Sequence, residues 1–536
     1  MEQIKLLPAL ALLLFTCTFC TKKVEQKKKR PNIVCIFADD HAFQAISAYG
    51  HPISKLAPTP NIDRLAKNGM LFTHAFVENS ICTPSRATLL TGRYSHQHGQ
   101  KLLGSRMNYD KTWFVELLQK AGYKTSVFGK WHLSVDPKGF DYYDILFDQG
   151  EYYNPKFKSP ETNGEYVTEH GYATTLITDH AMDWIDKNSN SDQPFCILVN
   201  HKAPHRNWMP DLENLNLYND AKFPEPPTLF DDYKTRGDQM QQQQLTVAEH
   251  LGYAFDLKVE ELKDEPTLQY IKDSWPMAMN TLTLDQRKIW DEAYAAQNKD
   301  FLANRPTGKD LVRWKYQRYI HDYCRTVHSV DEQVGRLLDF LEKKGELDNT
   351  IIIYTSDQGF FLGEHGLYDK RFMYEEAFRT PLIIFYPKEI KAGSKCDELV
   401  QNIDYAPTFL DVAGVDVPDD MAGTSLEPLF ATGKSEDWRK ELYYHFYDYP
   451  AVGNVRRHYG IRTDRYKLIH WYGKGYNGDP DIDSWELFDL KKDSTEVHNV
   501  HGTSEYHDIQ TKLKEDLVQL RKNIHSTEGD DRQYTH

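Results

Sequence analysis

The sequence predicts an α/β protein with a small antiparallel sheet at its C-terminal end. Apolar, β-branched runs alternate with amphipathic helical segments along most of the chain, which is the pattern of an α/β domain. After about residue 435 the pattern changes to short aromatic runs separated by turns, such as "ELYYHFYDYP" and "WELFDLKKD". Such runs indicate an antiparallel sheet. We therefore expect a large unit over residues 31–435 and a smaller one over residues 436–536.

Length and charge limit the class of protein. The chain has 536 residues, enough for a large α/β domain and a smaller companion. It carries 64 Lys and Arg against 79 Asp and Glu, a net charge of −15. The sequence has no basic stripe of the kind that binds nucleic acid. Because the chain is acidic, any anionic substrate must be bound in a local cationic pocket.

The N-terminus predicts export. Residues 1–21 read "MEQIKLLPALALLLFTCTFCT", a short basic start followed by an apolar run and then small residues and cysteines. This is typical of a secretory signal peptide and is too short for a stable membrane span. We expect a periplasmic or cell-surface bacterial protein, with residues 22–30 as a solvated tether. Lipidation of Cys17 or Cys20, which would give a lipid anchor, stays open beside plain signal cleavage.

The predicted strands end in side chains that chemistry could use. The segments "RPNIVCIFADD", "GYKTSVFGKWHL", "PFCILVNHKAPH" and "TIIIYTSDQG" are apolar and then turn polar. Open α/β sheets bind their ligands at the carboxyl ends of strands. The residues expected at these ends are Asp39, Asp40, Lys130, His132, His201, His205, Asp357 and Gln358.

Helices are expected between and after these strands. "SRATLLTG" is predicted as a helix that opens just after Cys82 and Pro84. The segment 212–306, with "QMQQQQ" and many Asn, Asp and Pro, is typical of an insertion of helices and loops. A long amphipathic helix is predicted over 311–345 and a terminal helix over 506–523.

The cysteines do not predict a disulfide framework. Two of the seven lie in the predicted signal peptide, and the others are scattered without a CxxC pair. One of these five is therefore available for chemistry. They are Cys35, Cys82, Cys196, Cys324 and Cys396.

Two sets of polar side chains complement each other. Asp39, Asp40, Asp357 and Gln358 offer three carboxylates and an amide oxygen, which suit a hard cation such as Ca²⁺ or Mg²⁺. Each acidic pair alone could simply cap a turn. The cationic set consists of Arg86, Lys130, His132, His205 and Lys370. A divalent ion together with such cations is what a tetrahedral oxyanion requires in a water-poor site.

The stretch "CTPSRATLLTGR", from Cys82 to Arg93, matches the motif C-x-P-S-R-x-x-x-L-T-G-R. By this motif, and by "ADD", "GKWH", "APH" and "SDQGFFLGEHGLYDKRFMYEE", the chain resembles the type I sulfatases. The resemblance implies an alkaline-phosphatase-like fold, a large mixed sheet flanked by helices with a smaller C-terminal antiparallel sheet. It implies hydrolysis of sulfate esters, with Cys82 oxidised to Cα-formylglycine by a maturation enzyme. One hydroxyl of the hydrated aldehyde attacks sulfur and the other later expels sulfate.

The resemblance also assigns roles to residues. The metal, Ca²⁺ as the usual ion with Mg²⁺ as the alternative, would be held by Asp39, Asp40, modified Cys82, Asp357 and Gln358. Gln358 stands where many members have Asn or His. Arg86 and Lys130 would stabilise the formylglycine and sulfate oxygens, and His132 would take a proton from the formylglycine hydroxyl. His205 and Lys370 would contact the sulfate and the leaving oxygen, with His205 as general acid.

The segments "GLYDKRFMYEE" and "VRRHYGIRT" are similar to those of bacterial glycosaminoglycan sulfatases, especially N-acetylglucosamine-6-O-sulfatases. This implies a sulfated oligosaccharide substrate and removal of 6-O-sulfate from heparin or heparan sulfate fragments. Asp369 and Arg371 flank Lys370, so they would reach sugar hydroxyls. His458 would contact the sugar from the smaller unit, and His201 would line the pocket wall. For Asp369, Arg371 and His458 an internal salt-bridge network is the alternative.

Other functions stay open at this point. One is a sulfatase for another sugar, such as a uronate 2-O-sulfate or a galactosamine sulfate. Another is a phosphonate or phosphodiester hydrolase of the same superfamily, although Lys130, His132 and Lys370 favour sulfate. A third is a glycan-binding protein in which Cys82 is never oxidised, which the complete polar set disfavours.

Overall fold

The computed structural model of the chain describes residues 29–189, 193–263, 265 and 269–526. The predicted signal peptide, both cysteines considered for lipidation and most of the predicted tether lie outside the described residues. Within the described ranges, no helix is both long and apolar enough to cross a bilayer.

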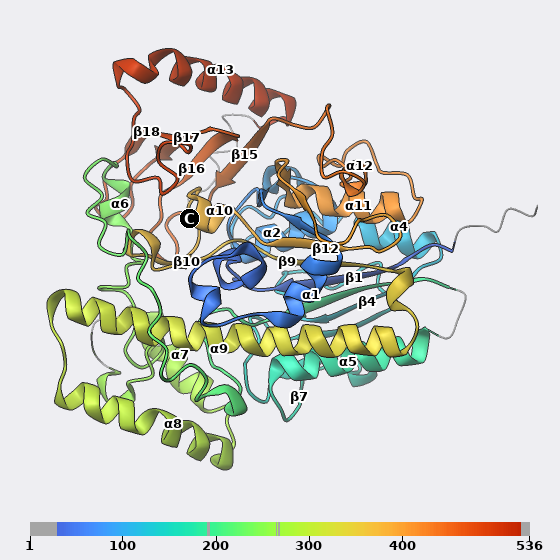
Figure 1. Cartoon of the computed structure of the whole chain (residues 1–536), viewed down its shortest axis with the longest axis horizontal. Helices are drawn as coiled ribbons and strands as arrows, with labels where there is room; N and C mark the ends of the chain where they lie inside the picture. The colour runs from blue at the N-terminus through green and yellow to red at the C-terminus, as the bar shows by residue number, and fades with distance from the viewer. Residues whose placement is uncertain (1–28, 190–192, 264, 266–268, 527–536) are drawn as a thin grey trace, which may run out of the picture.

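The core is a ten-stranded sheet in the order β13-β2-β12-β9-β1-β8-β4-β5-β6-β7 (Figure 1). Pairing is parallel along β9-β1-β8-β4-β5 and antiparallel where β12, β6 and β7 join. The predicted large mixed sheet is therefore confirmed. The strands are β1 (Asn32–Ala38), β2 (Met70–Phe72), β4 (Lys124–Gly129), β5 (Tyr142–Leu146), β6 (Lys156–Lys158), β7 (Val167–Thr168), β8 (Phe195–His201), β9 (Thr350–Ser356), β12 (Leu382–Phe385) and β13 (Ser394–Cys396).

Helices cover both faces of the sheet because both faces are apolar. Successive side chains of a strand point to opposite faces, and those of the central strand β1 enter two different hydrophobic clusters. Ile33 and Phe37 pack with side chains of α2 (Cys82–Thr91), α4 (Phe114–Lys120) and α11 (Tyr405–Val412). Val34 and Ile36 pack with side chains of α1 (Pro60–Asn68), α5 (Ala173–Asn188) and α9 (Gly308–Lys343). Figure 1 shows these two layers on either side of the sheet.

The helices follow the sequence predictions, with shifted ends. The long helix α9 begins three residues before the predicted start at residue 311 and ends two residues before residue 345. Helix α2 begins at Cys82 instead of after Pro84, because proline is tolerated in a first helical turn, where its missing N–H has no helical partner. The insertion contains helices and loops, as predicted. The remaining helices are α3 (Ser95–His98), α6 (Gln239–Gln242), α7 (Gln269–Met279), α8 (Leu284–Ala303), α10 (Glu375–Phe378), α12 (Glu427–Phe430) and α13 (His507–Asn523).

A second, smaller antiparallel sheet lies at the C-terminal end, as predicted. Its aromatic strands bury one face against α13, where Leu468 and Leu487 pack with Leu513 and Leu517. The strands are β15 (Glu441–Phe446), β16 (His458–Thr463), β17 (Tyr466–Gly473) and β18 (Ile482–Asp489). Two further pairs are β10 (Phe361–Leu362) with β11 (Tyr368–Asp369), and β3 (Ala75–Phe76) with β14 (Val400–Gln401).

Candidate active site

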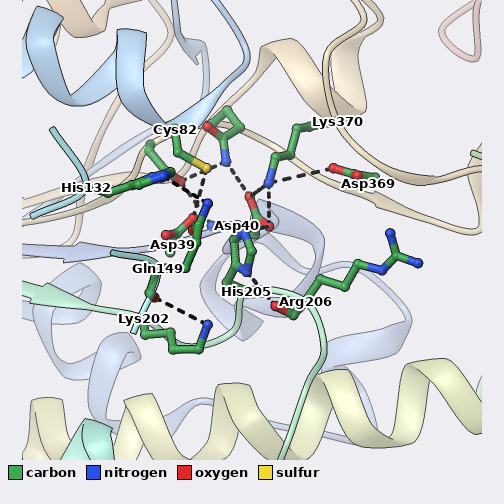
Figure 2. A network of polar contacts seen from close by, with 12 residues as sticks. Asp39, Asp40, Cys82, His132, Gln149, Lys202, His205, Arg206, Asp369 and Lys370 are labelled. Atoms are coloured by element: carbon green, nitrogen blue, oxygen red, sulfur yellow. Dashed lines mark hydrogen bonds and ion pairs between the residues drawn. The ribbon is translucent and has the colours of Figure 1, made fainter. Parts of the chain in front are cut away.

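The polar residues predicted at strand ends meet at one edge of the large sheet. Asp39 and Asp40 follow β1, Asp357 and Gln358 follow the neighbouring strand β9, and Lys130 follows β4. Because these strands are parallel, their carboxyl ends lie together. Figure 2 shows the side chains converging from separate segments on one centre.

Helix α2 places Cys82 and Arg86 against this centre. The two residues are four apart, so they lie on the same face of the helix. The Cys82 thiol lies 3.4 Å from Asp39 Oδ1, and one Arg86 nitrogen lies 3.2 Å from both Asp39 Oδ2 and Asp357 Oδ2. Burial and the Asp39 carboxylate raise the pKa of the Cys82 thiol. The opening residue of the motif is therefore buried beside the predicted metal ligands.

The acidic residues form a donor set that fits a divalent cation. Asp39, Asp40 and Asp357 are fully buried, and an oxygen of each lies within 4.8 Å of the others. Burial and the neighbouring Asp39 carboxylate raise the pKa of Asp40 to about 6 and that of Asp357 to about 7. In the part of the chain that the structure describes, the buried Gln358 Oε1 has no hydrogen-bond partner. A hard cation with oxygen ligands would offset the crowded negative charge.

Lysines neutralise part of this charge. Lys370 Nζ donates to Asp40 Oδ1 at 2.6 Å and to Oδ2 at 2.7 Å, and Lys130 forms an ion pair with Asp39. His205 Nε2 lies 3.7 Å from Asp40 Oδ2. Burial and the charge of Lys130 hold the pKa of His205 well below its usual range. The predicted cationic set is thus assembled around the carboxylates.

Gln149, in the loop after β5, fixes the tautomer of His132. A lysine ammonium can only donate, so Lys130 Nζ, 2.6 Å away, makes Gln149 Oε1 the acceptor. The other end of the amide then donates its N–H to His132 Nε2 at 2.9 Å. Burial and Lys130 hold the pKa of His132 well below its usual range, so the ring is neutral. Its proton therefore lies on Nδ1, and Nε2 is the basic nitrogen.

A cavity of 810 Å³ opens beside this centre. Its lining includes Cys82, His205 and Lys370 from this centre, together with Asp369 and Arg371. The volume is in the range of ligand-binding pockets. Residues of the insertion, including Phe255 and Met277, line it as well. The cavity is therefore large enough to admit sugar rings together with the sulfate group.

Four residues of this site have a strained backbone conformation. The φ angles are positive at Asp40 (60°), His132 (49°), Asp369 (75°) and Arg371 (93°), a region that side-chain-bearing residues rarely adopt. Such conformations persist only where the surrounding structure imposes them, and they cluster at functional sites. The strain favours a functional role for Asp369 and Arg371. The two side chains also form an ion pair, with Arg371 Nη1 2.7 Å from Asp369 Oδ2, as in the alternative of an internal salt bridge.

The structure does not bring His201 or His458 to the pocket. His201 ends strand β8, is 1% exposed and is absent from the pocket lining. His458 is fully buried; its Nε2 accepts the N–H of Met373 at 3.1 Å and its Nδ1 donates to Arg456 O at 2.9 Å. The prediction that His458 contacts the sugar is therefore corrected. Its ring nitrogens are both used by the main chain, and it supports the segment that carries Arg371.

The sequence analysis missed Gln149 and Lys202, which both line the pocket. A signal for Gln149 was present, because "ILFDQG" ends a strand in Asp-Gln-Gly as "IIIYTSDQG" does at Gln358. Lys202 stands between His201 and His205, but a lone lysine near a strand end is usually exposed. Its burial, at 5% exposure, is a tertiary property.

The fold and the site define a member of the sulfatase family. Residues 31–415 match the family model described as Sulfatase, and residues 363–523 match the one described as N-sulphoglucosamine sulphohydrolase, C-terminal. The first match covers most of the chain, so the chain belongs to this family. It is a sulfuric ester hydrolase, and membership implies a formylglycine and a divalent metal.

Relatives share most of its length. N-acetylglucosamine-6-O-sulfatase of Bacteroides thetaiotaomicron is 46% identical over 533 residues, covering 98% of this chain and 92% of the relative. Human N-acetylglucosamine-6-sulfatase is 27% identical over 463 residues, covering 81% of this chain and 70% of the relative. One solved structure, 46% identical with a TM-score of 0.87, covers 94% of this chain and 100% of that chain. It is described as a complex with its substrate D-glucosamine-2-N,6-O-disulfate.

Proposed function

We propose that this enzyme removes the 6-O-sulfate of N-acetylglucosamine in heparin or heparan sulfate fragments. The observation that carries this is the 46% identity, over 98% of the chain, to an N-acetylglucosamine-6-O-sulfatase. The similar solved structure supports it, because its stated substrate is a glucosamine that carries a 6-O-sulfate. The signal-like N-terminus adds the proposal that the enzyme acts in the periplasm or at the cell surface, with or without a lipid anchor.

The residues at the strand ends would hold the metal, which we propose is Ca²⁺. Three carboxylates and an amide oxygen are ligands that Ca²⁺ prefers. When bound, the ion supplies positive charge against the sulfate oxygens. Arg86 and Lys130, each paired with Asp39, would add charge-assisted hydrogen bonds to the same oxygens.

The remaining residues would move protons and position the ester. After conversion, position 82 provides the hydroxyl nucleophile. His132 is neutral, and its Nε2 lone pair accepts from Gln149. We propose that this amide moves away from Nε2 when the ester binds, so that Nε2 accepts the proton of that hydroxyl. His205 lines the pocket, where the negative charge of a bound ester would favour its protonated form as general acid. Lys370 would contact the leaving oxygen, and Asp369 and Arg371 the sugar hydroxyls.

The test is sulfate release by fully modified protein, with conversion of Cys82 verified by mass spectrometry and the calcium content by elemental analysis. The panel is N-acetylglucosamine 6-sulfate, glucosamine N,6-disulfate, a galactosamine sulfate and an unsaturated uronate 2-sulfate disaccharide. We expect release from the two glucosamine 6-sulfates alone. Cys82→Ala is the blank and should release none. Release only from the galactosamine or uronate substrate would overturn the proposed substrate.

A further inference from the structure

The pocket contains a buried lysine, Lys202, that forms no ion pair with any residue the structure describes. Lys202 follows strand β8 and is 5% exposed. Within the described part of the chain its only hydrogen bond is a long one, 3.4 Å from Nζ to the main-chain oxygen of Gln149, and no carboxylate forms an ion pair with it. Its ammonium otherwise lies 4.9 Å from the ring centre of Tyr152. Figure 2 shows the side chain ending beside Gln149.

Another buried lysine, Lys258, has a structural role, and its ammonium forms more hydrogen bonds than that of Lys202. Lys258, 2% exposed, donates to the carbonyl oxygens of Asn207 at 2.5 Å, Phe255 at 3.0 Å and Asp256 at 3.1 Å. Burying an ammonium is costly unless its donors are satisfied in this way. Among the described residues Lys202 has only its long hydrogen bond to Gln149 O, so its other donors are open to a ligand.

The other buried cations of the pocket are already paired. Arg206 forms hydrogen bonds at 2.7 and 2.6 Å to Asp256, and Lys370 forms an ion pair with Asp40. Glu151 lines the same pocket, and its charge favours the protonated form of Lys202, but among the described residues no ion pair joins the two. Burial and the charge of Lys130 lower the pKa of Lys202 to about 8, so it is mostly charged at neutral pH.

Lys202 is also close to the centre that would bind the sulfate. Gln149 receives Lys130 Nζ on its side-chain oxygen and Lys202 Nζ on its main-chain oxygen. Gln149 therefore bridges the ammonium of Lys130, which would face the reacting sulfate, and the ammonium of Lys202. A second anionic group that reaches Lys202 must belong to the same sugar or to its direct neighbour.

We propose that Lys202 binds a second anionic group of the substrate, in addition to the sulfate that is removed. This inference rests on the proposed function, because it refines the substrate class to sulfated glucosamines with a further negative charge. Two groups offer the required chemistry: an N-sulfate on the same sugar and the carboxylate of an adjacent uronate.

The experiment compares Lys202→Met with the unmutated enzyme on three substrates at fixed ionic strength. These are N-acetylglucosamine 6-sulfate, glucosamine N,6-disulfate, and N-acetylglucosamine 6-sulfate linked to a uronate. We expect the ratio of kcat/KM for a doubly anionic substrate to kcat/KM for N-acetylglucosamine 6-sulfate to fall about tenfold or more. A fall with the disulfate identifies the N-sulfate as partner, and a fall with the uronate disaccharide identifies the carboxylate.

Two controls separate charge from folding. Lys202→Arg keeps the charge and should largely keep the ratio. Lys158→Met removes a lysine that pairs with Asp136 outside the pocket lining and should change nothing. Equal losses on all three substrates, or an unchanged ratio, would overturn the inference while leaving the proposed function intact. If the unmutated enzyme releases no sulfate from any of the three, the proposed function itself fails.

Discussion

At the scale of single residues, the amide of Gln149 links the two basic groups of the site. It accepts from Lys130 and donates to His132, so the orientation of one side chain sets both the position of an ammonium and the tautomer of an imidazole. Residues that orient a reacting group in this way are often as sensitive to mutation as the group itself.

We expect Gln149→Glu to lower kcat about 10- to 100-fold, more than Gln149→Met does. A carboxylate would still accept from Lys130, but its second oxygen would accept from His132 and place the imidazole proton on Nε2. The nitrogen proposed to take the formylglycine proton would then be blocked, whereas methionine leaves the tautomer free. Steady-state kinetics on an activated aryl sulfate measure the difference. Equal losses in the two variants would show that Gln149 only holds Lys130.

The metal ligands and the motif cysteine could be placed from the sequence because their signals are local. Asp39 and Asp40 stand where an apolar strand turns polar, and parallel strands bring such ends together. Whether a polar side chain is buried away from the pocket depends on packing between distant segments. His458 lies in the polar run "RRHYG". It is nevertheless fully buried, and it accepts a hydrogen bond from the main chain of Met373, which is distant in the sequence. The sequence pattern could not show this.

At the scale of elements, the small sheet supports the segment that lines the pocket. Tyr444 of β15 donates its hydroxyl to Arg371 O at 2.7 Å, and His458 of β16 accepts from Met373 N at 3.1 Å. Lys370, just before, is held by two hydrogen bonds to Asp40. The small sheet therefore contacts the main chain of the segment that we propose faces the sugar.

We expect His458→Phe to lower kcat/KM on N-acetylglucosamine 6-sulfate more than on an activated aryl sulfate, as Arg371→Ala should. Phenylalanine fills the space but leaves the Met373 N–H without its acceptor, at a cost of about 1–3 kcal/mol. The ratio of the two kcat/KM values is the measurement, with thermal unfolding to confirm the fold. A matching loss on both substrates would show that the damage extends to the sulfate end.

At the scale of the whole molecule, a buried charge cluster joins the small sheet to the catalytic part. Lys467 of β17 is fully buried and lies 2.9 Å from Glu375 of α10 and 2.7 Å from Glu496. Glu496 also accepts the main-chain N–H of Glu375 at 2.7 Å. Burial raises the pKa of Glu496 to about 7 despite Lys467. Arg462 and Lys467 outweigh burial at Glu375 and hold its pKa below the usual range.

The cluster leads to a prediction on stability and pH. Removing one partner of a buried ion pair typically costs about 3–5 kcal/mol, since a charge is left uncompensated. We expect Lys467→Met to show this loss at pH 8 and a smaller one at pH 5. Without the lysine, the folded-state pKa of Glu496 rises further above the value of an unfolded glutamate, and that of Glu375 loses part of its lowering. Stability then falls as pH rises, because the folded state must release protons that it holds more tightly than the unfolded state does.

Denaturant unfolding of both proteins at the two pH values measures the effect, and Lys512→Met is the matched control. Lys512 is exposed and pairs with Asp516 one helical turn away, a contact worth less than about 1 kcal/mol. It should show little change at either pH. A loss in Lys467→Met that is the same at pH 5 and pH 8 would mean that packing, and not charge, joins the two parts. A loss confined to pH 8 would show that Lys467 acts by neutralising the carboxylates on both sides of this junction.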